Sequence, residues 1–206
     1  MAFLHHTPKF LHQYFKNFLW NCPTTDKVIY LTFDDGPVPE VTPWVIGQLA
    51  SLQAKATFFC VGDNVRKHPS QFQQIVMAGH QVGNHTFNHL NGWKTPTAHY
   101  LQNVLACQET LGSAASQLFR PPYGRITPEQ TKLLKEQYKI VLWDVLSWDF
   151  ERRFDAKISL KNTIKHTQTG SIVVFHDSVK SFKQLQYILP RYLEHFASQG
   201  FKFESL

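Results

Sequence analysis

The chain of 206 residues is long enough for one well-buried core and too short for two ordinary domains joined by an extended linker. Hydrophobic residues make up 43% of the chain and aromatic residues 14%, a globular composition that does not indicate disorder. The formal net charge of +6 is spread over scattered lysines and arginines, so we expect a solvated surface and no nucleic-acid partner.

The first 24 residues carry an amphipathic pattern. Helical spacing predicts one apolar stripe, formed by Phe10, Leu11, Tyr14, Phe15, Phe18 and Leu19. We expect residues 1–24 to pack on a domain formed by residues 25–206, and peripheral association of this helix with a membrane is the weaker alternative. The sequence has no apolar run of the length of a secretory signal or a membrane span, so a cytoplasmic location is expected.

Apolar runs and helical periodicity alternate through the rest of the chain. Strands are predicted at residues 28–33, 56–61, 81–84, 119, 140–145, 171–175 and 201–203, and helices at residues 42–52, 65–78, 97–111, 128–137, 158–166 and 185–198. The repeated order of strand and helix predicts parallel strands. With about seven strands rather than eight, the expected fold is a single α/β domain shaped as a distorted, incomplete (β/α) barrel.

Two strings of polar residues indicate a metal site. Asp34 and Asp35 follow the first predicted strand in the string TFDDGP, and His85 and His89 lie four residues apart in NHTFNH. Adjacent carboxylates at the mouth of a buried strand repel each other unless a cation lies between them. Two imidazoles and one carboxylate suit zinc or a similar ion and leave the second aspartate free to act as a base. Each string alone also fits an ordinary turn or an exposed helix face.

Three further strings place reactive side chains after predicted strands. Arg120 follows residue 119 in FRPPYG, Asp144 lies in LWDVLSWD, and His176 follows the strand at residues 171–175 in IVVFHD. In α/β barrels the carboxyl ends of the parallel strands form one face. We therefore expect these residues to converge with the aspartates and histidines on that face.

Taken in order, the strings resemble the five motifs of the polysaccharide deacetylase family, also called carbohydrate esterase family 4 or the NodB-homology domain. The matching strings are TFDDGP, HTFNH, RPPYG, residues 144–148 and VVFHD, and the resemblance runs from about residue 28 to the end. It implies a distorted (β/α) barrel. It also implies removal of N- or O-acetyl groups from glycans with the help of a divalent metal ion.

The resemblance implies a metal site and a base. Asp35, His85 and His89 would bind one divalent ion, for which zinc is favoured and cobalt, nickel and manganese are also suitable. Asp34 would be the general base that takes a proton from the attacking water. Arg120 would pair with Asp34 and aim its carboxylate.

The resemblance also implies an acid and a binding wall. His176 would be the general acid that protonates the leaving sugar nitrogen, and Asp144 would hold its imidazole in the charged form. The backbone N–H of Tyr123 would hold the oxyanion. Trp148 and Val174 would form the apolar wall that receives the acetyl methyl group.

The leading interpretation is a metal-dependent hydrolase that removes acetyl groups from N-acetylated sugars or glycans. An O-acetyl esterase or a small-amide hydrolase would use the same metal and base, so this alternative stays open. A metal-dependent glycan-binding protein without turnover is a further alternative, against which Asp34 and His176 argue. Ser147 stands where many family members carry a carboxylate, which leaves a role for that side chain in the substrate groove in doubt.

Overall fold

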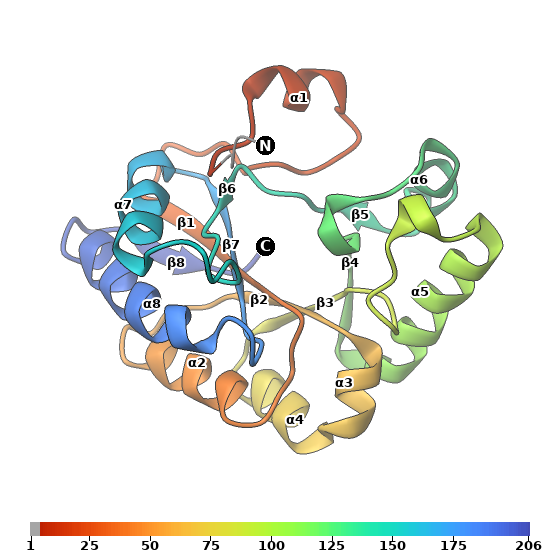
Figure 1. Cartoon of the computed structure of the whole chain (residues 1–206), viewed down its shortest axis with the longest axis horizontal. Helices are drawn as coiled ribbons and strands as arrows, with labels where there is room; N and C mark the ends of the chain where they lie inside the picture. Colours follow the sequence, from red (N-terminus) through yellow and green to blue (C-terminus); the bar gives the residue numbers. More distant parts are fainter. Residues whose placement is uncertain (1–4) are drawn as a thin grey trace.

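The strands of the chain form one curved sheet with helices around its outer face (Figure 1). This computed structural model describes residues 5–206. The strands are β1 Val28–Asp34, β2 Thr57–Cys60, β3 Gln81–Asn84, β4 Ala115–Phe119, β5 Lys139–Ile140, β6 Val145–Leu146, β7 Ile172–His176 and β8 Lys202–Glu204. Their order is β5-β4-β3-β2-β1-β7-β6, with β8 beside the first half of β1, and each of these pairings is parallel. The predicted α/β fold with an incomplete barrel is confirmed.

The helices follow the predicted order with one division. They are α1 Lys9–Tyr14, α2 Val41–Ala50, α3 Gly62–Lys67, α4 Pro69–Met77, α5 Thr97–Leu111, α6 Pro128–Leu134, α7 Ala156–His166 and α8 Phe182–Ala197, with short 3₁₀ turns η1 Gly92–Lys94, η2 Gly112–Ala114 and η3 Pro122–Gly124. The single helix predicted at residues 65–78 is two helices, α3 and α4. The break lies at His68, whose φ of −128° and ψ of 56° are not helical, because Pro69 disfavours the helical conformation of the residue before it.

The predicted strand at residues 140–145 is also two elements. β5 pairs with β4 and β6 pairs with β7, so these two short strands form the two edges of the open barrel. Residues 141–144 cross from one edge to the other. No strand spans this stretch, so the barrel stays open between β5 and β6.

The N-terminal segment lies along this opening (Figure 1). The N–H of Leu19 donates to the carbonyl of Ile140 at 2.9 Å, and the N–H of Leu142 donates back to Leu19 at 2.8 Å. The N–H of Thr7 donates to the backbone carbonyl of Asp144 at 2.8 Å. These bonds supply partners for strand-edge groups that would otherwise be unpaired.

The helix in this segment is shorter than the predicted stripe. It ends at Tyr14, and Phe10 and Tyr14 are 66% and 81% exposed, while Leu19 pairs with the barrel backbone. The chain leaves the helical path at Phe15, whose φ of −107° and ψ of 62° are not helical. No helix within residues 5–206 combines the length and apolar character needed to cross a membrane.

Side chains along β1 point alternately to the two faces of the sheet, and this separates the core residues from the site residues. Ile29, Leu31 and Phe33 face outward into the main apolar cluster beneath the helices. Thr32 and Asp34 face the interior of the barrel, where Thr32 contacts Arg120. The strand therefore ends with a buried carboxylate at the carboxyl edge of the sheet.

Candidate active site

The turn after β1 is held by a buried aspartate, Asp177, to which no role was assigned from the sequence. Asp177 accepts a hydrogen bond from the N–H of Gly36 at 3.1 Å and another from the hydroxyl of Thr42 at 2.6 Å. A Cβ on Gly36 would lie 2.0 Å from Asp177 Oδ2, so only glycine allows this approach. Burial raises the pKa of Asp177 to about 8. Asp35 lies in this turn with a φ of 82°. The side chains of Asp34 and Asp35 therefore point to different partners.

Asp35, His85 and His89 come together at the carboxyl end of the strands. Asp35 Oδ1 lies 3.1 Å from His89 Nε2 and 3.7 Å from His85 Nε2, and one ligand atom from each residue lies within 4.8 Å of the others. Burial opposes ionisation of Asp35, but the hydrogen bond from His89 and the neighbouring imidazoles outweigh it and lower its pKa. This donor set of two imidazoles and one carboxylate fits a divalent ion of the zinc type.

The orientation of His85 is fixed by a contact outside the cluster. Its Nδ1 lies 2.7 Å from the carbonyl oxygen of Arg120. A carbonyl only accepts, so Nδ1 carries the proton and the lone pair of Nε2 points to Asp35 and His89. Burial lowers the pKa of His85 to about 4, which keeps the ring neutral as a metal ligand must be.

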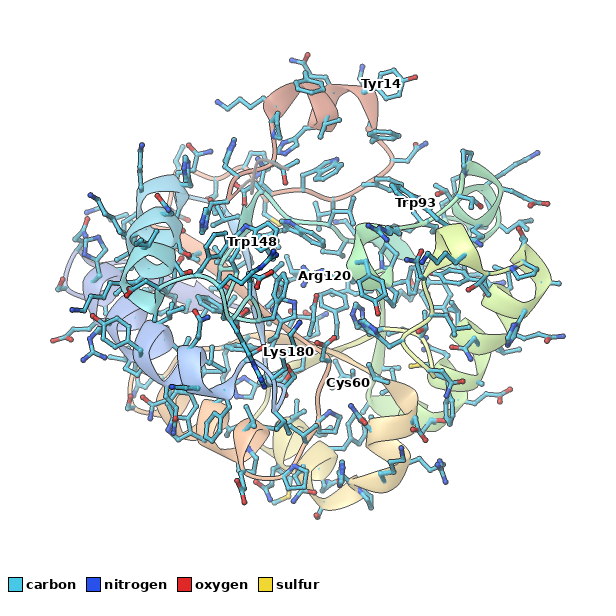
Figure 2. All side chains as sticks on the ribbon, in the orientation of Figure 1. Tyr14, Cys60, Trp93, Arg120, Trp148 and Lys180 are labelled. Carbon is cyan, nitrogen blue, oxygen red and sulfur yellow. The ribbon has the colours of Figure 1, made fainter. Side chains whose placement is uncertain are left out.

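Asp34 is paired with the buried side chain of Arg120, near the middle of the barrel in Figure 2. Arg120 Nη1 lies 2.7 Å from Asp34 Oδ1 and also donates to the hydroxyl of Thr32 at 2.8 Å, and Nη2 donates to the carbonyl of Leu142 at 3.1 Å. The guanidinium lies 4.1 Å from the centre of the Phe59 ring. These contacts fix the guanidinium, and the charge-assisted bond in turn fixes the Asp34 carboxylate.

The carboxylate that contacts His176 is Asp149, which corrects the prediction of Asp144. Asp149 Oδ1 lies 2.8 Å from His176 Nδ1, and Asp149 Oδ2 accepts the backbone N–H of His176 at 2.8 Å. Burial alone would lower the pKa of His176, but the charge and hydrogen bond of Asp149 outweigh it and raise this pKa to about 9. The ring is therefore charged at neutral pH.

Asp144 lies at the opposite end of β6. This strand begins at Val145, and its Leu146 pairs with Val174, two residues before His176. A partner for His176 must therefore follow Leu146, as Asp149 does. Asp144 instead accepts a hydrogen bond from the hydroxyl of Ser171 at 2.9 Å, and burial raises its pKa to about 7.

Two of the predicted wall residues, Tyr123 and Val174, lie by the site. Tyr123 has a φ of 61° in η3, and its ring centre lies 4.7 Å from that of His89. Val174 pairs in register with Thr32, so its side chain shares the interior face of the barrel. The ring of Phe150 lies 4.7 Å from that of His176 between centres, and Trp148 packs on Phe150 at 5.3 Å. The sequence analysis did not single out Phe150, although it directly follows Asp149.

The five motifs thus meet at one end of an open barrel. The family model described as Polysaccharide deacetylase matches residues 21–140, more than half of the chain. The chain belongs to the polysaccharide deacetylase family. The resemblance drawn from the motifs is therefore confirmed.

Relatives in the polysaccharide deacetylase family extend the match over most of the chain. A peptidoglycan-N-acetylglucosamine deacetylase from Bacillus cereus is 34% identical over 191 residues, covering 89% of this chain and 88% of that protein. A chitooligosaccharide deacetylase from Azorhizobium caulinodans is 36% identical over 157 residues, covering 72% and 73%. Other relatives are longer, and the chain spans 58% of one and 38% of another.

A solved structure shows the same fold. The crystal structure of a peptidoglycan N-acetylglucosamine deacetylase in complex with 4-naphthalen-1-yl-N-oxidanyl-benzamide has a TM-score of 0.88 and 30% sequence identity to this chain. The match covers 97% of this chain and 95% of the other. The N-terminal segment is thus included in the shared architecture.

Proposed function

We propose that this chain is a metal-dependent hydrolase that removes acetyl groups from N-acetylated glycans, with zinc as the favoured ion. The observation that carries the proposal is the convergence of Asp35, His85 and His89 within 4.8 Å. The pairs Asp34–Arg120 and His176–Asp149 end on the same sheet edge, since Asp34 and His176 are partners in the β1–β7 register. Relatives named as deacetylases of peptidoglycan and of chitooligosaccharides support the substrate class.

The base side of the site is built around Asp34. A divalent ion held by Asp35, His85 and His89 would polarise the acetyl carbonyl and lower the pKa of a water molecule. Asp34, held in place by Arg120, accepts the proton of the attacking water. Among the described residues the N–H of Tyr123 has no hydrogen-bond acceptor, which leaves it available to the oxyanion.

The acid side is built around His176. An amine leaving group is so basic that it must be protonated at or near the moment of bond breaking. With its pKa raised to about 9, His176 holds a proton at neutral pH. Its Nδ1 is hydrogen-bonded to the carboxylate of Asp149. The proton on Nε2 is therefore the one transferred to the sugar nitrogen.

Acetate release tests this proposal. The substrates are N-acetylglucosamine oligomers, peptidoglycan fragments and O-acetylated xylan, each incubated with chelated enzyme and with enzyme resupplied with zinc or cobalt. We expect release that depends on metal and that Asp34→Asn lowers at least about a hundredfold, as for loss of a general base. The matched control is Asp26→Asn, which removes an exposed carboxylate before the amino end of β1.

The other outcomes are also informative. Release from O-acetylated xylan alone would replace the amide reaction with an esterase reaction. Metal-dependent binding of glycans without release of acetate from any substrate would favour a binding protein. Release that survives complete removal of metal would overturn the proposal.

A further inference from the structure

The loop that carries α1 stands away from the barrel. Thr7 and Leu19 are hydrogen-bonded to the barrel edges at the two ends of this loop, and we call residues 8–18 between them the N-terminal projection. In Figure 1, α1 lies at the top of the view, clear of the other helices. No residue of α1 is buried. The projection is therefore held at both ends and exposed along its length.

The outer surface of the projection is aromatic. Phe10, Tyr14 and Phe15 are all exposed, and we call these three residues the aromatic face. Tyr14 lies at the upper rim of the molecule in Figure 2. The rings of Tyr14 and Phe15 lie 4.9 Å apart between centres, and Phe15 stacks on Phe18 at 5.8 Å. Exposed apolar rings that are grouped in this way mark sites of interaction with a protein or a membrane.

The aromatic surface continues from the projection to Trp93. A hollow of ≈ 520 Å³ lies between the projection and α6, and its lining includes Tyr14, Phe15 and Trp93. The Trp93 ring is largely exposed, and its Nε1 donates to the carbonyl of Ile126 at 3.2 Å. Tyrosine and tryptophan rings, which are apolar with one polar atom, are enriched at the level of lipid headgroups. Trp93 therefore extends the aromatic surface without adding an unpaired polar group.

The charges around the aromatic face are positive. The sequence before Asp26 contains no aspartate or glutamate, and its two lysines, Lys9 and Lys16, are both exposed on the projection. Lys132 and Lys135 line the hollow on the side of α6, and within the described part of the chain no acid lines it. A surface with charges of one sign attracts partners of the opposite sign. The partner that fits is therefore both apolar and anionic.

Charge also decides between a lipid surface and a second copy of this chain. A symmetric pair would bring the same lysines of both copies together. The acids on α6 are already engaged, since Glu129 accepts a hydrogen bond from the hydroxyl of Thr97 at 2.5 Å and Glu136 lies 4.0 Å from Lys135. An anionic bilayer instead offers phosphates to the lysines and an apolar boundary to the rings.

We propose that the N-terminal projection docks the protein on an anionic lipid bilayer, with the aromatic face inserted among the headgroups and Lys9 and Lys16 against the lipid phosphates. Insertion of a few rings and attraction of a few charges are each weak alone, and together they give peripheral binding. The backbone bonds of Thr7 and Leu19 keep the projection on the barrel, so the barrel is held at the lipid surface. This role goes beyond the removal of acetyl groups and does not depend on it.

Cosedimentation with vesicles measures the docking. The vesicles are phosphatidylcholine alone or phosphatidylcholine with about 30 mol% phosphatidylglycerol, in about 0.1 M salt. The whole chain should sediment with the anionic vesicles and not with the neutral ones. Phe10→Ser should lower the partition coefficient about tenfold and Lys16→Gln about fivefold, because they remove one inserted ring and one surface charge. Lys183→Gln, an exposed lysine on α8, is the control for net charge and should have a much smaller effect.

Fluorescence quenching tests which part of the molecule enters the bilayer. Phe10→Trp and Met77→Trp each add one tryptophan at an exposed position, on α1 and on α4, which lie at opposite ends of the view in Figure 1. The anionic vesicles are prepared with phosphatidylcholine brominated in its acyl chains, which quenches tryptophan on contact. Quenching relative to the parent chain should increase for Phe10→Trp and stay unchanged for Met77→Trp.

Several results would overturn the proposal. Absence of sedimentation with the anionic vesicles would remove the docking itself. Equal losses from Lys16→Gln and Lys183→Gln, or equal quenching of the two added tryptophans, would show attraction by net charge without a defined face. Dimers of the intact chain in sedimentation velocity that Phe10→Ser abolishes would assign the aromatic face to a second copy. None of these measurements requires release of acetate, so they stand or fall separately from the proposed hydrolase.

Discussion

The charge state of His176 depends on one neighbouring carboxylate. Asp149→Asn removes the anion at Nδ1, which destabilises the protonated ring and lowers its pKa from about 9. Because the proposed acid is the protonated ring, the alkaline limb of kcat/KM against pH should move to lower pH by about one unit or more. The matched control is Asp144→Asn, a buried aspartate bonded to Ser171, which should leave the limb in place. A shift produced by Asp144→Asn and not by Asp149→Asn would restore the pairing expected from sequence.

The role of His176 as acid is tested by changing the leaving group. His176→Ala should lower kcat for N-acetyl sugars about a hundredfold or more and have a much smaller effect on an activated acetyl ester, whose leaving group departs without a proton. The measurement is kcat on both substrates with the same enzyme preparation. His195→Ala, an exposed histidine on α8, is the control. Equal losses on the amide and the ester would show that His176 supports the site without donating the proton.

The convergence of Asp35, His85 and His89 could be predicted from sequence because it depends on strand ends that the apolar runs and turns place to within one residue. Asp35 lies at the end of β1, which has a strong apolar pattern, and His85 directly follows β3 at the predicted strand end, Asn84. The carboxylate that contacts His176 was predicted wrongly because residues 140–145 were interpreted as one strand that ends near Asp144. The chain instead makes two short strands, so the first carboxylate past the end of β6 is Asp149. An error of a few residues in a strand boundary thus selects the wrong carboxylate.

At the scale of elements, the turn after β1 is held against β7 through a contact that no local pattern reveals. Asp177 lies next to His176 in sequence, but its acceptor role depends on the β1–β7 pairing that brings Gly36 beside it. The hydroxyl of Thr42, in α2, donates a hydrogen bond to the other carboxylate oxygen of Asp177. The positions of Asp34 and Asp35 therefore depend on the packing of three elements, β1, β7 and α2.

Gly36→Ala tests this arrangement. The added Cβ would lie 2.0 Å from Asp177 Oδ2, so the turn or the carboxylate must move, at a cost of about 1–3 kcal/mol in the free energy of unfolding. Because the turn carries Asp35, zinc affinity measured by titration should fall together with stability measured by denaturant unfolding. Gly47→Ala in α2 is the matched control, since its Cβ would meet no atom within 4 Å and should be neutral or slightly stabilising. Unchanged zinc affinity in Gly36→Ala would separate the turn from the metal site.

For the molecule taken together, the sequence predicted the fold class and the alternation of strands and helices along the chain. It did not predict how the gap in the barrel is covered. Alternating strands and helices determine a parallel sheet with its reactive ends on one side. The closure of the gap between β5 and β6 depends on backbone bonds to Leu19 and Thr7. Backbone pairing of this kind leaves no side-chain periodicity in the sequence, and the apolar stripe there instead predicted a longer helix.

The N-terminal segment should therefore contribute to stability through its backbone rather than through the exposed face of α1. Deleting residues 1–20 removes five hydrogen bonds to the barrel edges: two between Leu19 and residues 140 and 142, two from Thr7 to residues 143 and 144, and one from Leu146 to His5. With a net contribution of about 1 kcal/mol for each lost bond, Tm should fall by about 10 °C or more in a thermal unfolding scan. Phe10→Ser, which changes a side chain that is 66% exposed, should leave Tm unchanged. If the deletion left Tm unchanged while the intact chain sedimented with anionic liposomes, the segment would be a membrane-binding helix and not part of the barrel.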